Sequence, residues 1–195
     1  MEDKIFWQII DMYALNGHEG AYLNGVIERL SLTSVPDVYG FQIALHKKMK
    51  NLCNWNCYGV FLLIEIVIDD EKFHDFRLWI IARGEVFYNT FLQDPELVAD
   101  DLLATYEGDM PYLQGLSSVA GNSLLRLKNI AFSKDDMALY HSPVDNAFKI
   151  GESYGFIADL TGEKLSSDEE YQRKYPKIFD ATEGEFLRYK EKYGL

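Results

Sequence analysis

The chain has 195 residues, of which 48% are hydrophobic and 14% aromatic, so it can bury a full core. Charged residues of both signs make up 26%, and no repeat or Pro/Gly/Ser-rich tract interrupts them, which predicts one folded domain over 1–195. The net charge of −12 repels phosphate backbones and anionic lipids, so nucleic acid and membrane surfaces are not expected as partners.

Helical periodicity dominates the first third of the chain. We expect helices over four stretches: 3–16, 19–30, 34–54 and 55–68. Gly17 stops the first of them, and Ser34 followed by Pro36 predicts the start of the third. The stretch 55–68 is ambiguous, because its β-branched residues favour a strand whereas its length favours a buried helix. We expect a helix there.

Capping residues mark the helices of the remaining chain. The expected helices cover six stretches: 69–83, 85–92, 94–106, 117–127, 167–175 and 182–193. Asp94 followed by Pro95 predicts one helix start and Ser167 another, while Pro176 bends or ends the helix before it. The predicted fold is mainly α, a single compact multi-helix domain with a variable region at 108–165 and closing helices within 166–195. The signal in 108–115 and 131–161 is mixed.

The two cysteines and the N-terminal sequence give evidence about the cellular location of the protein. Cys53 and Cys57 lie four residues apart in a predicted helix, which suits neither a disulfide nor a paired metal site, so we expect them reduced and half-buried. The N-terminus is acidic and amphipathic and lacks the pattern of a signal peptide. The longest apolar run, 57–68, is too short to span a bilayer and contains Glu65. A cytoplasmic location is therefore expected.

The helix 69–84 has an arginine in its apolar stripe. At 100° per residue Phe73, Phe76 and Ile80 share one face, and Arg77 falls in the middle of it. A guanidinium that faces a core must be paired or must hold an anion. We expect Arg77 to be buried against a carboxylate, with Asp70, Asp69 and Glu65 as candidates in that order. Glu65, alone in an apolar run, should itself be paired.

Five side chains of this helix are candidates for a binding site or pocket: Asp69, Asp70, His74, Arg77 and Trp79. The two aspartates could hold a metal or act as a base, but aspartates at a helix start more often cap its free N–H groups. Trp79 lies on the polar flank of the helix, so it is either packed by another segment or part of a binding surface, and we favour packing.

Other catalytic patterns are absent or broken. The stretch 115–121 resembles G-x-S-x-G, but its second glycine comes too late, and no phosphate-binding glycine loop or H-E-x-x-H motif is present. Asp70 and His74 supply at most half of a metal-ligand set. We therefore assign no catalytic residue, no metal ligand and no cofactor.

One pattern resembles a known family. It combines Phe6-Trp7-Gln8-Ile9-Ile10 with Asp69-Asp70-x-x-Phe73-x-x-Phe76-Arg77-x-Trp79-Ile80-Ile81-x-x-Gly84 and then Asp94-Pro95-Glu96-Leu97. Over a core of about 3–107, this pattern resembles an uncharacterised bacterial family known as domain of unknown function 4240, and 169–177 resembles its closing helix. The resemblance implies a mainly helical domain and no established activity.

Two functional hypotheses follow. The first is a non-catalytic interaction protein, for example an acidic immunity or regulatory partner of another bacterial protein, because a net charge of −12 steers a domain toward basic surfaces. The negative charge should then gather in patches, and the richest segments are 94–101 with Glu107 and Asp109, and 167–170 with Asp180, Glu183 and Glu185. The alternative is an enzyme or small-anion binder with an Asp/His/Arg pocket.

Overall fold

The computed structural model describes residues 1–12, 18–65, 69–106, 112–129, 137–151 and 153–182. Its α-helices are α1 (Asp3–Asp11), α2 (Glu19–Ser31), α3 (Val35–Asn51), α4 (Trp55–Ile64), α5 (Asp70–Ala82), α6 (Glu85–Gln93), α7 (Ala99–Tyr106), α8 (Val119–Leu127), α9 (Met137–Lys149) and α10 (Asp168–Lys174). Short 3₁₀ helices are η1 (Pro95–Val98), η2 (Gln114–Ser118) and η4 (Ile157–Asp159), and 176–182 is also helical. The fold is mainly α, as predicted, with no strand in these ranges.

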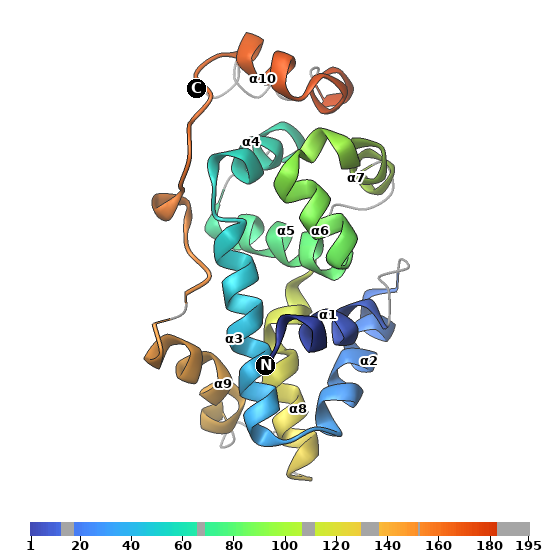
Figure 1. Ribbon diagram of the computed structural model, residues 1–195, viewed down its shortest axis with the longest axis vertical. Coiled ribbons are helices and arrows are strands. Elements are labelled where there is room, and N and C mark those ends of the chain that lie inside the picture. Colours follow the sequence, from blue (N-terminus) through green and yellow to red (C-terminus); the bar gives the residue numbers. More distant parts are fainter. Residues whose placement is uncertain (13–17, 66–68, 107–111, 130–136, 152, 183–195) are drawn as a thin grey trace.

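The long helix α3 connects two groups of helices (Figure 1). At one end it packs with α8 and α9, and α8 also packs against α2. At the other end the chain continues into α4, which lies against α5 near α6, η1 and α7. From α9 the chain returns along one side of the molecule to α10, on the far side of α4 (Figure 1). We call the returning segment, residues 153–161, the strap.

Side-chain caps mark several helix starts. Ser34 and Asp37 form a reciprocal capping box at α3, Asn54 accepts a hydrogen bond from the backbone N–H of Cys57 at α4, and Ser167 caps α10. The stretch from 55 is helical, as we expected, but the helix ends at Ile64. No helix of the described ranges combines the length and the apolar character that crossing a bilayer requires.

Several boundaries differ from prediction. The expected helix 94–106 is divided into η1 and α7, because Asp94 caps a tight 3₁₀ turn before the α-helix begins. Pro176 starts the helical stretch 176–182, since a proline fits the first turn of a helix. The expected helix 182–193 lies outside the described residues apart from its first position.

The mixed region 131–161 contains a full helix. α9 has Pro143 in its interior, where a proline removes a backbone hydrogen bond and normally breaks a helix. The packing of α9 against α3 and α8 outweighs this local cost.

The expectation for the cysteines was wrong in two respects. Cys53 lies in the link between α3 and α4, and only Cys57 is helical. Both are free thiols, but both are fully buried rather than half-buried. Burial raises the pKa of both thiols.

Candidate functional site

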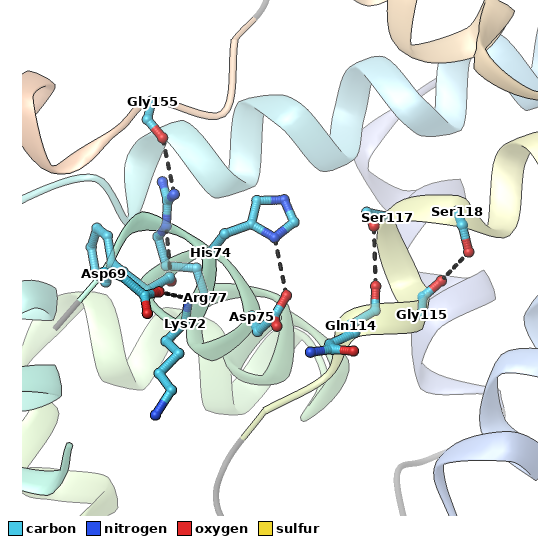
Figure 2. A network of polar contacts seen from close by, with 11 residues as sticks. Asp69, Lys72, His74, Asp75, Arg77, Gln114, Gly115, Ser117, Ser118 and Gly155 are labelled. Atoms are coloured by element: carbon cyan, nitrogen blue, oxygen red, sulfur yellow. Dashed lines mark hydrogen bonds and ion pairs between the residues drawn. The ribbon is translucent and has the colours of Figure 1, made fainter. Parts of the chain in front are cut away.

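The start of α5 is held by a side-chain cap. Asp69 Oδ1 accepts a hydrogen bond from the backbone N–H of Lys72 at 2.7 Å (Figure 2). Because the first turn of a helix has N–H groups without helical partners, this bond stabilises the end of α5. The predicted capping role of Asp69 is confirmed.

Arg77 is 1% exposed, and its hydrogen bonds to the described residues all go to main-chain oxygens. Its Nε donates to the carbonyl of Phe73 at 3.3 Å, one Nη donates to the carbonyls of Met49 and Tyr154, and the other donates to that of Gly155 at 3.0 Å. The side chain points from α5 toward Gly155 in the strap (Figure 2). One guanidinium therefore joins α5, the last turns of α3 and the strap.

The predicted carboxylate partner of Arg77 was wrong. Among the described residues, no carboxylate lies within ion-pair distance of Arg77. Asp70 instead accepts a hydrogen bond from the backbone N–H of Ile157 at 2.7 Å. The partial negative charges of several carbonyl oxygens stabilise the guanidinium in place of a carboxylate. The Met49 carbonyl is free to accept this bond because it lies in the last turn of α3, where carbonyls have no helical N–H partner. Desolvation lowers the pKa of Arg77.

Glu65 is buried and paired, as expected. Its Oε1 accepts a hydrogen bond from Lys72 Nζ at 3.0 Å, which connects the end of α4 to the first turn of α5. The carboxylate that was the third candidate for Arg77 is therefore used elsewhere.

His74 and Trp79 point in different directions on α5. His74 is partly buried, with Nδ1 3.2 Å from Asp75 Oδ1 and its ring edge-on to Tyr154 in the strap. Trp79 is 4% exposed and packs edge-on against Phe87 of α6. The interpretation that another segment covers Trp79 is confirmed.

The strap is the part of this region that the sequence did not reveal. Cys53 Sγ donates to the carbonyl of Phe156 at 3.2 Å, and the Cys53 carbonyl accepts from the backbone N–H of Thr161 at 3.2 Å. The backbone N–H of Trp55 then donates to the carbonyl of Thr161 at 2.9 Å. Main-chain groups of the strap make these hydrogen bonds, so no residue type in the strap marks them in the sequence.

Replacing Gly155 with alanine is expected to lower the free energy of unfolding by about 2 to 3 kcal/mol. Gly155 has φ +68°, and an added Cβ would lie 2.7 Å from the buried Cys53 Sγ. Gly162→Ala is the matched control, because Gly162 has φ +87° and open space around it, so it should lose only about 1 kcal/mol. Urea unfolding measures both, and equal losses would contradict a close-packed strap.

Two hollows lie among the described residues, and the five candidate residues, Asp69, Asp70, His74, Arg77 and Trp79, line neither of them. One hollow of about 490 Å³ lies beside α1 and α2, and a second of about 240 Å³ lies where α5 turns into α6. Within the described ranges, no three His, Cys, Asp or Glu side chains gather in a way that could hold a metal ion.

The geometry defines a mainly helical protein in which the buried Arg77 holds α5, α3 and the strap together. The chain belongs to the family described as protein of unknown function (DUF4240), whose family model matches residues 1–124. The match includes α1 to α7 and therefore the Arg77 helix, while the strap and α10 lie beyond it. No curated protein and no solved structure matches the chain.

Proposed function

We propose that this chain is a non-catalytic, cytoplasmic interaction protein that binds another protein through a basic surface of that partner, as an acidic immunity or regulatory protein would. The observation that carries the proposal is the contact between the acid-rich segment 94–101 and the stretch 176–182, which contains the nominated Asp180. The net charge of −12 supports it, because such a charge accelerates encounter with a basic partner.

Lys177 connects the acid-rich segment 94–101 to the stretch that contains Asp180. Its backbone N–H donates to Glu96 Oε1 at 2.5 Å, and its Nζ lies 3.1 Å from Asp100 Oδ2. This places 176–182 against η1 and α7, so that the exposed carboxylates of Asp101 and Asp180 belong to neighbouring segments. We call η1, α7 and 176–182 the acidic face. The nominated residues Glu107, Asp109, Glu183 and Glu185 lie outside the described residues.

The internal contacts of α5 favour this proposal over the enzyme or anion-binding alternative. Four carbonyls accept hydrogen bonds from four of the five guanidinium N–H groups of Arg77, and the residue is only 1% exposed. The carboxylates of Asp69 and Asp70 accept main-chain N–H groups. These charged groups are therefore engaged in holding the fold.

The test is the salt dependence of association with the cognate partner, isolated by pull-down from the source organism. We expect the association rate constant to fall about tenfold or more between low and physiological salt, as the Debye length shortens from about 30 Å to about 8 Å. Stopped-flow mixing at constant pH measures this. An association rate constant that does not change with ionic strength would contradict the proposal.

A matched pair of variants localises the effect. Asp101→Asn combined with Asp180→Asn removes two charges from the acidic face and should slow association several-fold. Asp145→Asn combined with Glu163→Gln removes the same charge from exposed positions on α9 and after the strap, and should leave the rate nearly unchanged. Equal effects of the two pairs would indicate that only the net charge matters.

A further inference from the structure

We infer that the hollow beside α1 and α2 is where the partner docks, and that its occupant is an amphipathic segment with an apolar side chain next to a lysine or arginine. The inference rests on the proposed function and names the docking site and the chemistry of the partner. Neither hollow is lined by Arg77 or by its hydrogen-bond partners.

The larger hollow is mostly apolar and open. Its volume is about 490 Å³, and its walls include Ile5, Ile9 and Met12 of the α1 segment. Ile5 is 44% exposed and Met12 56%, although the rest of the apolar face of α1 is buried. Leu32, just after α2, is 76% exposed. Apolar side chains gathered at a concave surface are typical of a binding site for an apolar anchor.

An acidic border adjoins this hollow. Asp11 lines both hollows, and the smaller one, of about 240 Å³, is also lined by Glu85 and the 83% exposed Val86. Asp11 Oδ1 accepts a hydrogen bond from the backbone N–H of Glu85 at 3.1 Å. Gly84 permits this contact, because a Cβ there would lie 2.6 Å from Asp11 Oδ1.

The cation beside these carboxylates is already engaged. Arg83 lines the smaller hollow, but its guanidinium lies over the rings of Trp79 and Phe87 and 3.9 Å from Asp101. The carboxylates of Asp11 and Glu85 are exposed to solvent. Asp101 belongs to the acidic face, so Arg83 links that face to the smaller hollow.

The chemistry of the occupant follows from this arrangement. An apolar side chain fills the space between Ile5 and Met12, and a neighbouring lysine or arginine meets Asp11 and Glu85. Arg29, at the wall of the larger hollow, has no ion-pair partner among the described residues and can donate to a carbonyl or carboxylate of the same segment. An acidic peptide lacks the cation that the border requires.

The test uses two fluorescein-labelled helical peptides of about 14 residues, one of leucine and lysine and one of leucine and glutamate. Anisotropy titration of the full chain should show the lysine peptide binding at least about tenfold more tightly. Met12→Ser, Val86→Ser and Glu85→Gln should each weaken it by about fivefold. Circular dichroism confirms that each variant is folded.

Two control variants separate the site from general attraction to an acidic protein. Leu97→Ser alters a 63% exposed leucine on the acidic face, and Asp145→Asn removes an exposed charge on α9. Both should change the Kd of the lysine peptide by less than about twofold. Equal affinity for the two peptides would overturn the inference. So would an equal loss of affinity for the lysine peptide in the control variants and in the variants of Met12, Glu85 and Val86.

The cognate partner distinguishes this inference from the proposed function. If its association depends on salt but Met12→Ser and Val86→Ser leave its Kd unchanged, the docking site is wrong and the proposed function stands. If the lysine peptide binds at the hollow but the partner associates at a rate that ignores salt, the proposed function fails and the hollow remains a peptide-binding site.

Discussion

Replacing Arg77 with methionine should lower the free energy of unfolding by about 3 kcal/mol. Methionine fills a similar volume but donates no hydrogen bond, so the carbonyls of Met49, Tyr154 and Gly155 lose a charged donor in a buried place. The free energy of unfolding falls by less than these lost hydrogen bonds alone would cause, because the variant no longer has to desolvate a buried charge. Urea unfolding followed by tryptophan fluorescence measures the difference.

Two further variants test the geometry of this contact. Arg77→Lys keeps the charge but replaces a planar fork by a single ammonium group, so it should recover less than half of the loss. Arg83→Met is the control from the end of the same helix, where the arginine is partly exposed and pairs only at 3.9 Å, and it should cost less than about 1 kcal/mol. An Arg77→Met variant as stable as the native chain would contradict the fastening role.

A chain that ends at residue 129 should fail to unfold cooperatively. It keeps the family-matched region and α8, but it loses α9, the strap and the helices that follow. Four buried side chains would be lost with the last of these: Tyr171, Tyr175, Ile178 and Phe179. At about 1.5 to 3 kcal/mol each, their burial is comparable to the whole stability of an ordinary domain.

The measurements are calorimetry and dye binding. The shortened chain should show no sharp thermal transition and should bind a hydrophobic dye, because α4 would be uncovered where Tyr171 lies against Gly59. Tyr175→Ala in the full chain is the graded control, with a cooperative transition at a lower temperature. A sharp, dye-free transition in the shortened chain would show that residues 1–129 fold independently.

Local signals predicted the elements whose causes are local. The aspartate cap at α5, the start of α3 at Ser34 and the burial of Arg77 all depend on residues within about one or two turns, so spacing and residue type were enough. The same signals failed at Pro143 inside α9, where tertiary packing outweighs the cost of a proline. At Pro176 the preceding helix ends as predicted, but the proline then starts the helical stretch 176–182.

The sequence by itself determined that Arg77 is buried, that it needs a partner and that the chain is mainly helical. Only the tertiary structure decided what the partner is, because three of the four acceptors are main-chain oxygens 28, 77 and 78 residues away. Every residue carries the same carbonyl, so no residue type marks these positions. The hollow beside α1 was also hidden in the sequence, since its walls come from two segments that only the packing of α1 against α2 brings together.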